Sequence, residues 1–160
     1  NTLAQSDEMA RTGKRTVKQS TLRIIGGQWR GRRLSFTPAE GLRPTTDRVR
    51  ETLFNWLAPS IHGARCLDLF AGSGAAGIEA LSRGAARATF VERDAGAIST
   101  IERNLAATGF AGPRARIARS QVGTWFNKDA ARAGPFAAVL IDPPYDLPEL
   151  LEAADVATRT

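Results

Sequence analysis

The spacing of apolar residues along the chain changes at about Ala64. From there on, short apolar runs of strand length alternate with longer stretches in which apolar residues recur at helical spacing. Strands separated by helices of this length form a parallel sheet that helices cover on both faces. The predicted strands are residues 65–70, 88–91, 114–118 and 137–141, and the predicted helices are residues 75–82, 95–108, 122–131 and 147–157. The pattern therefore predicts a doubly wound α/β fold.

The segment before this alternation has a different pattern. Two short apolar stretches within residues 21–36 flank a group of glycines, which predicts a β-hairpin. A helix is predicted over residues 45–57, because Thr45 or Thr46 can cap its start. Pro59 is expected to end it. The apolar side of this helix is predicted to contain Val49, Leu53, Phe54, Trp56 and Leu57.

The composition fits one soluble globular domain. Of the 160 residues, 42% are hydrophobic and 24% are charged. No apolar run approaches the roughly 20 residues of a membrane span, and no apolar segment near the start resembles a secretory signal. The single cysteine, Cys66, excludes an internal disulfide and lies in an apolar run. We therefore expect a cytoplasmic protein in which Cys66 is a buried core residue.

The net charge of +6 is concentrated near the N-terminus. Residues 9–33 contain eight basic residues and no acidic one, whereas residues 34–160 contain 14 of each sign. A basic run at a chain end is usually a solvated tail, and we expect this of residues 1–20. The arginines of the predicted hairpin are candidates for binding a polyanion such as RNA: Arg23, Arg30, Arg32 and Arg33.

A glycine-rich motif, Gly-Ser-Gly-Ala-Ala-Gly at residues 72–77, follows the first predicted strand and opens a helix. Glycines in this pattern let the backbone approach a ligand closely, and alone they fit a nicotinamide or flavin cofactor equally well. Asp68 would repel a pyrophosphate near this turn and attract an ammonium group. Glu92, at the end of the next strand, can accept hydrogen bonds from ribose hydroxyls. S-adenosylmethionine has a ribose and an ammonium group but no phosphate, so these residues favour it.

A second motif, Asp142-Pro143-Pro144-Tyr145, follows the fourth predicted strand at the same edge of the sheet. An exocyclic base amine is a weak nucleophile because its lone pair is delocalised into the ring. The Asp142 carboxylate and the Pro143 carbonyl can accept hydrogen bonds from such an amine and free its lone pair. Tyr145 can stack on a flipped-out base. These four residues are the predicted catalytic set, and no Cys/His spacing indicates a metal.

Four strings of the sequence also carry a resemblance to a known family. They are RIIGGQWRGR (23–32), LRPTTDRVRETLFNWL (42–57), LDLFAGSG (67–74) and DPPY (142–145). Together, over about residues 22–150, they resemble the bacterial RsmD-type 16S ribosomal RNA guanine-N2 methyltransferases. The resemblance implies a Rossmann-like class I methyltransferase fold with S-adenosylmethionine as donor. It also implies methylation of guanine N2 in 16S ribosomal RNA, either free or in a small-subunit assembly particle.

The resemblance also implies roles for individual residues. The glycine turn would line the amino-acid end of the donor, Glu92 would hold its ribose, and Ser120 and Gln121 would lie at its adenine. Many methyltransferases have an acid where Gln121 stands, so an adenine contact there has to come from the amide or the backbone. Residues 43–50 would close over the site, and Arg43 joins the predicted RNA-binding residues. The full set of predicted cofactor-binding residues is Asp68, Ala71, Gly72, Ser73, Gly74, Glu92, Arg93, Ser120, Gln121 and Thr46.

The patterns and the resemblance together predict three regions. These are a disordered basic tail (1–20), an RNA-binding hairpin and helix (21–60) and a catalytic domain that binds S-adenosylmethionine (61–160). We expect the hairpin to fold separately from the catalytic body, and the protein to be a monomer. The family fold continues past the fourth helix of the alternation, so its C-terminal strands are expected to be missing from this chain.

Three other functions fit parts of the sequence. A nicotinamide-dependent oxidoreductase would use the glycines but leaves Asp68 and the Asp142–Tyr145 tetrapeptide unexplained. A non-catalytic RNA-binding module could retain a methyltransferase scaffold, although its site residues would then be expected to have degraded. An amino-methyltransferase that acts on DNA adenine or protein glutamine could use the same tetrapeptide.

Overall fold

The centre of the molecule is a parallel sheet of four strands in the spatial order β5-β4-β3-β6. The computed structural model describes residues 19–38, 45–110, 112–144 and 147–159. The strands are β3 (Arg65–Leu69), β4 (Arg87–Glu92), β5 (Ala115–Arg119) and β6 (Ala138–Ile141). The chain adds strands outward from β3 to β5 and then returns to place β6 on the other side of β3. The predicted doubly wound α/β fold is therefore confirmed.

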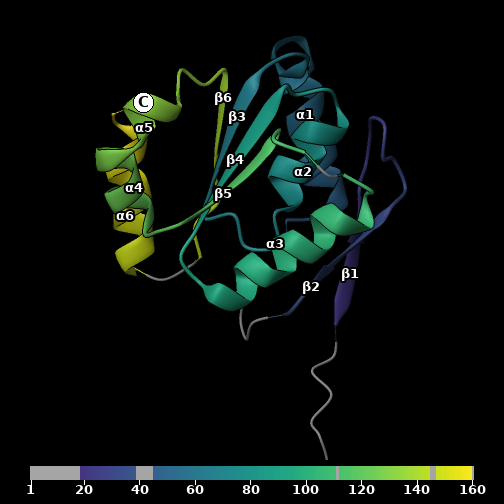
Figure 1. Cartoon of the computed structure of the whole chain (residues 1–160), viewed down its shortest axis with the longest axis horizontal. Coiled ribbons are helices and arrows are strands. Elements are labelled where there is room, and N and C mark those ends of the chain that lie inside the picture. The colour runs from purple at the N-terminus through teal and green to yellow at the C-terminus, as the bar shows by residue number, and fades with distance from the viewer. Residues whose placement is uncertain (1–18, 39–44, 111, 145–146, 160) are drawn as a thin grey trace, which may run out of the picture.

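Helices cover both faces of this sheet (Figure 1). On one face lie α1 (Asp47–Ile61), α2 (Ala75–Ser82) and α3 (Ala95–Ala107), and on the other lie α4 (Val122–Lys128), α5 (Ala130–Ala133) and α6 (Leu147–Ala157). The single helix predicted over residues 122–131 is divided because Asp129 has non-helical backbone angles, φ −120° and ψ −19°. No helix among the described residues is long and apolar enough to cross a membrane.

Side chains of β3 alternate between the two faces. Cys66 packs in a buried cluster with Phe54 of α1 and Ala80 of α2, whereas Leu67 and Leu69 pack on the opposite face with residues of α4 and α6. Cys66 is thus a buried core residue, as predicted. Its burial, together with the nearby Asp68, raises the pKa of its thiol to about 11. The thiol therefore stays protonated and unreactive at neutral pH.

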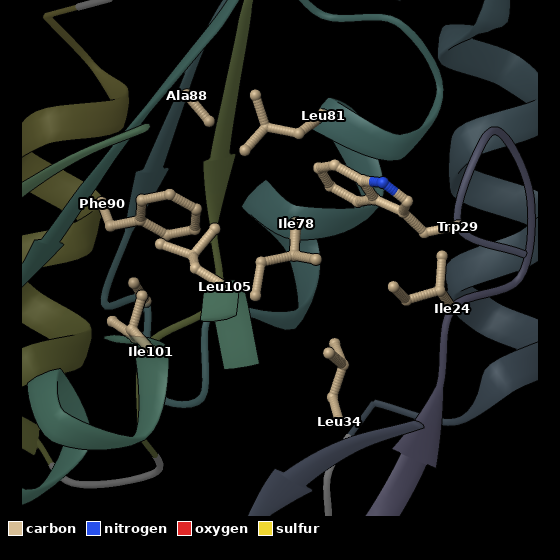
Figure 2. Packing of buried hydrophobic residues seen from close by; sticks show 10 residues of the cluster. Ile24, Trp29, Leu34, Ile78, Leu81, Ala88, Phe90, Ile101 and Leu105 are labelled. Atoms are coloured by element: carbon tan, nitrogen blue, oxygen red, sulfur yellow. The ribbon is translucent and has the colours of Figure 1, made fainter. Parts of the chain in front are cut away.

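The predicted hairpin is present, formed by β1 (Ser20–Arg23) and β2 (Arg33–Phe36) in antiparallel register. Ile24 and Trp29, from the loop between its strands, pack in one buried cluster with Ile78 of α2 and Phe90 of β4 (Figure 2). Leu34 of β2 belongs to the same cluster. The expectation that the hairpin folds separately from the catalytic body is therefore wrong, because its apolar side chains complete the core beside α2 and α3.

The Glu79 carboxylate of α2 holds the hairpin loop in place. It is fully buried and accepts the backbone N–H groups of Ile25 and Gly26, each at 2.9 Å. Arg83 Nε lies 2.8 Å from one of its oxygens, and Arg50 Nη1 of α1 lies 3.8 Å from the other. A buried carboxylate is stable only when it is paired and hydrogen-bonded in this way. The ionic cluster therefore joins α1, α2 and the hairpin loop.

The end and the apolar side of α1 differ from the prediction. The helix continues through Pro59 to Ile61, because a proline in the last turn removes only one helical hydrogen bond. Phe54 is buried, but Val49 and Trp56 are 55% and 78% exposed. Val49 and Trp56 are seven residues apart, so they lie on the same side of the helix, outside its buried stripe. Helical spacing thus overestimated the width of the buried stripe.

We predict that Glu79→Ala lowers the free energy of unfolding by about 3–5 kcal/mol, because it leaves buried arginines and two backbone N–H groups without their carboxylate. Urea unfolding of the variant measures this loss. Glu102→Ala, at an exposed position of α3, is the control and should change stability by less than about 0.5 kcal/mol. A loss of similar size in both variants would show that the cluster does not hold the hairpin.

Candidate functional site

A cavity of about 850 Å³ lies at the carboxyl ends of the parallel strands. Its walls come from the segments that follow β3, β4, β5 and β6 and from the start of α1. It extends across the gap between β3 and β6, where the direction of winding reverses, and open α/β sheets bind ligands at this place. The volume also falls within the range of about 300–1,000 Å³ that is usual for small-molecule sites.

The turn from β3 into α2 requires unusual backbone angles. Phe70, Gly72 and Gly74 have positive φ values of 57°, 56° and 79°. Glycine adopts such angles freely, whereas Phe70 is held there against its steric preference, and it borders the cavity. Gly77 is needed for a different reason, because a Cβ atom at this position would lie 2.3 Å from the Phe90 ring. The close packing of α2 on β4 thus depends on the last glycine of the motif.

Three glycine N–H groups of this motif already have acceptors within the protein. Gly72 donates to Glu92 Oε2 at 2.8 Å, and Gly77 donates to Asp68 Oδ2 at 2.9 Å. Gly74 donates to a carbonyl of the turn itself at 2.8 Å. A phosphate-binding turn needs such groups free to contact the phosphate, and the Glu92 carboxylate beside it would repel that anion. The geometry therefore disfavours a dinucleotide and favours a ligand with hydroxyl and cationic groups.

Glu92 is well placed for hydroxyl groups but is already engaged. Besides the Gly72 N–H, its carboxylate accepts the N–H groups of Arg93 and Asp94 at 2.9 and 3.0 Å. A carboxylate offers about four acceptor positions, so one remains for a ligand hydroxyl. A second hydrogen bond from the ribose could form only if one of these backbone N–H groups no longer donated to Glu92. The double ribose contact stays a prediction with this constraint.

Asp68 lies behind the cavity wall, where it holds the start of α2. The alternation of β3 turns its side chain to the same face as that of Cys66, toward the Gly77 N–H. Burial raises the pKa of the Asp68 carboxyl from its usual 3.8 to about 8. The Gly77 hydrogen bond opposes this rise, and the charges of Asp142 and Glu92 add to it. Any attraction of Asp68 for a ligand ammonium therefore acts through the turn.

Most of the predicted site residues border one cavity. Of the predicted cofactor-binding residues, those that line it are Thr46, Ala71, Gly72, Ser73, Glu92, Arg93, Ser120 and Gln121. Asp68 and Gly74 are buried beneath its wall. Asp142, Pro143 and Pro144 of the predicted catalytic set also line it. Tyr145 and Arg43 lie outside the described residues.

Asp142 meets the N-terminal segment of the protein at the β6 end of the cavity. The Thr45 hydroxyl donates a hydrogen bond to Asp142 Oδ2 at 2.9 Å. Thr46 caps α1 by accepting the Val49 N–H at 3.3 Å, so the capped helix start fixes the neighbouring Thr45. Asp142 Oδ1 has no hydrogen-bond partner among the described residues. One oxygen is thus oriented by Thr45, and the other can accept a hydrogen bond from a ligand.

Sequence reasoning missed two residues of the cavity wall, Glu149 and Glu152 of α6. Arg50 of α1 also lines the cavity and belongs to the segment 43–50 that the resemblance placed over the site. Glu149 forms an ion pair with Arg93. Helical spacing predicts α6 but does not say which side meets the cavity, so no local signal identified its two glutamates. Within the described parts of the chain, no three His, Cys, Asp or Glu side chains are grouped as a metal site would require.

The predicted RNA-binding arginines of the hairpin differ in what they contact. Arg32 donates a hydrogen bond to the Thr108 carbonyl at the end of α3, so it fastens the hairpin to the body. Arg33 donates to the Thr21 hydroxyl at 3.3 Å across the hairpin, and Arg30 is exposed. Arg30 and Arg33 are thus better candidates for contact with a polyanion than Arg32.

A smaller hollow of about 290 Å³ lies between the hairpin and the start of α1. Arg23 and Arg33 line it, and Arg23 also forms an ion pair with Asp47 at 3.3 Å. Thr45 and Thr46 border both this hollow and the main cavity. The arginine side of the hairpin therefore adjoins the entrance near Asp142.

Comparisons with known proteins agree with this geometry. The family model described as Conserved hypothetical protein 95 matches residues 22–158. The chain is 55% identical over 124 residues to the Ribosomal RNA small subunit methyltransferase D of Escherichia coli K12, a match that covers 78% of this chain and 60% of that protein. The protein of the same name from Haemophilus influenzae is 47% identical, with 78% and 64% covered. The chain thus spans less than two thirds of the length of these relatives.

A solved structure supports the same relationship. The structure of the Escherichia coli protein yhhF superposes with a TM-score of 0.70 and 46% sequence identity, covering 86% of this chain and 72% of that one. This chain therefore shares its fold with that solved structure.

We predict that the stability difference between the wild type and Asp68→Asn depends on pH. Folded Asp68 keeps its proton up to about pH 8, whereas the unfolded chain loses it near 3.8. Its stabilising contribution is therefore complete below pH 3.8 and is lost as the pH rises to about 8. Asparagine can still accept the Gly77 N–H and does not titrate, so the variant should gain stability relative to the wild type across this window. Urea unfolding at several pH values measures the difference, and a difference that stays constant with pH would contradict the raised pKa.

Proposed function

The chain belongs to the Conserved hypothetical protein 95 family, and we propose that it methylates the exocyclic N2 amine of a guanine in 16S ribosomal RNA with S-adenosylmethionine as donor. The observation that carries this proposal is the strand-end cavity. In it, Asp142-Pro-Pro and a glycine motif line the same cavity, and the Gly72 and Gly77 N–H groups of that motif donate to carboxylates. The names of the relatives, which are small-subunit ribosomal RNA methyltransferases, support the choice of substrate. The acceptor RNA is proposed either free or in a small-subunit assembly particle.

The residues of the cavity fit the donor. When bound, S-adenosylmethionine supplies a methyl group on a positively charged sulfur. Ala71, Gly72 and Ser73 would hold its amino-acid end, Glu92 its ribose, and Gln121 its adenine. The Glu92 carboxylate beside the turn suits a cationic ligand and opposes a pyrophosphate. This is also the reason to prefer a methyltransferase over a nicotinamide-dependent oxidoreductase.

The tetrapeptide would act on the acceptor amine. A hydrogen bond to Asp142 Oδ1 and another to the Pro143 carbonyl would draw the nitrogen out of conjugation with the ring and free its lone pair. The nitrogen must lose a proton when its bond to the methyl carbon forms, and the Asp142 carboxylate supplies an acceptor for that proton. Thr45 keeps the carboxylate oriented through its other oxygen. Positive charge develops on the nitrogen during transfer, so Asp142 stabilises the transition state more than the bound substrate.

A transfer assay tests the function. The full chain is incubated with donor labelled in its methyl group and with 16S ribosomal RNA, small-subunit assembly particles or DNA, and the labelled nucleoside is identified after digestion. Label in N2-methylguanosine supports the proposal. Label in DNA adenine would keep the chemistry and replace the substrate. Binding of NAD but not of S-adenosylhomocysteine in a thermal-shift titration would overturn the proposal.

Asp142→Ala should lower kcat by at least about 100-fold while changing the affinity for S-adenosylhomocysteine little, because Asp142 contacts the acceptor amine. Thr45→Val should have a smaller effect, a decrease in kcat of about fivefold, which corresponds to about 1 kcal/mol for one hydrogen bond. Single-turnover transfer and calorimetry separate the two quantities. An Asp142→Ala enzyme that keeps more than about a tenth of the wild-type kcat would contradict the assigned role.

Replacing Arg30 and Arg33 with alanine should weaken RNA binding and leave donor affinity unchanged. Each lost phosphate contact lowers the slope of log affinity against log salt by about 0.7–0.9, so the double variant should lose about 1.4–1.8. Filter binding over a range of salt concentrations measures this slope. Arg87, at the start of β4, and Arg132 of α5 are exposed outside the hairpin and serve as a charge-matched control pair. Equal losses in the two double variants would mean that the hairpin does not recognise the RNA.

A further inference from the structure

The proposed function indicates which part of the ligand lies at each end of the cavity. Asp142 follows β6, and the segments after β4 and β5, with Glu92 and Gln121, lie on the far side of β3. Neighbouring strands are about 4.8 Å apart, so the β6 and β5 ends are separated by about 14 Å. If the methyl group meets the acceptor at Asp142 and the ribose lies at Glu92, the adenine must lie beyond Glu92, at the β5 end.

The β5 end of the cavity needs an acceptor for the adenine 6-amino group. Selection of adenine over a 6-oxo purine depends on such a group, because a 6-oxo purine presents a carbonyl oxygen at that position. Gln121 is the N-cap residue of α4, and its side chain makes no capping hydrogen bond. Its amide carries both a donor and an acceptor and can turn either toward a ligand. Gln121 alone therefore discriminates poorly between the two purines.

Glu152 brings a carboxylate to this end from another helix. α6 packs against α4 on one face of the sheet (Figure 1), and Glu152 lines the cavity with Gln121 and Val122. Glu152 Oε1 accepts the N–H of Gly123 in the first turn of α4. It thereby takes the capping role that Gln121 leaves open. Gly123 leaves room for this contact, because a Cβ atom there would lie only 3.0 Å from Oε1.

The second oxygen of Glu152 is available to a ligand. Oε2 has no hydrogen-bond partner among the described residues, and Glu152 forms no ion pair with any residue that the structure describes. Glu149, one helical turn earlier, differs because Arg93 pairs with its carboxylate. Glu152 is therefore a carboxylate with one oxygen fixed by the backbone and with the other free to accept a hydrogen bond.

We propose that Glu152 is the residue by which this site selects adenine, with Oε2 accepting a hydrogen bond from the 6-amino group while Oε1 stays on the Gly123 N–H. This inference rests on the proposed function. Many methyltransferases have an acid at the position of Gln121, and in this chain α6 would supply that acid instead. A glutamine at position 152 would keep an oxygen on Gly123 but would turn an NH₂ group toward the adenine amine. Two donors would then face each other.

Binding of two ligands that differ only at the purine tests the proposal. Calorimetry of the full chain measures the affinities for S-adenosylhomocysteine and S-inosylhomocysteine, which has a 6-oxo group in place of the amine. Glu152→Gln should bind S-adenosylhomocysteine about tenfold or more weakly, the usual effect of losing a hydrogen bond to a charged group. It should bind S-inosylhomocysteine as well as or better than the wild type does, because its NH₂ group can donate to the 6-oxo oxygen. Glu102→Gln is the matched control and should keep the wild-type ratio of affinities.

The outcomes distinguish this inference from the proposed function. A Glu152→Gln variant supports the assignment if it melts at the wild-type temperature and its affinity for S-adenosylhomocysteine relative to S-inosylhomocysteine is lower than that of the wild type. If the wild type binds S-adenosylhomocysteine and Glu152→Gln has the same ratio of the two affinities as the wild type, the role of Glu152 is overturned and the proposed function stays intact. A wild type that binds neither ligand overturns both. If Glu152→Gln does not fold, Gly123→Ala gives a second test, since its added methyl group displaces the carboxylate and should lower the ratio in the same direction.

Discussion

Two carboxylates from neighbouring parallel strands hold the turn on which the whole site depends. Asp68 of β3 binds the Gly77 N–H, and Glu92 of β4 binds the Gly72 N–H. These bonds fix both ends of the glycine motif to the sheet and occupy two of its backbone N–H groups. The cavity beside the turn is thereby suited to a cation with hydroxyl groups. The fold and the choice of ligand thus follow from the same hydrogen bonds.

The carboxylates have different states because their surroundings differ. Asp68 is buried between β3 and α2, and burial raises its pKa to about 8, so it holds a proton at neutral pH. Glu92 is only half-buried and accepts three backbone N–H groups, which leaves about one position for a ligand. In our proposal, a structural acid and a ligand-binding acid therefore stand side by side, although each lies on a strand of the same sheet.

The N-terminal segment is part of the catalytic body. Arg50 of α1 donates to the Arg23 carbonyl at 3.0 Å, and Glu79 of α2 binds the hairpin loop. Asn104 of α3 connects the hairpin to the glycine turn, because its side chain donates to the carbonyls of Ser35 and Ser73, each at 2.9 Å. An RNA that binds the hairpin arginines would therefore contact a segment that is hydrogen-bonded to elements lining the proposed donor cavity. In our proposals, substrate recognition and donor binding share one rigid core.

The sequence by itself determined the order of strands and helices, the hairpin, the glycine turn and the motif after β6. Each of these depends on neighbours in the chain: alternating polarity, glycines that allow positive φ, and prolines that end regular structure. Tertiary structure alone decided that Asp68 lies behind the wall, that Val49 and Trp56 are exposed on α1, and that Glu152 reaches the cavity. Those positions depend on which side of a strand or helix meets a partner distant in sequence. A single sequence records the spacing within an element, but the packing of one element against another fixes its orientation.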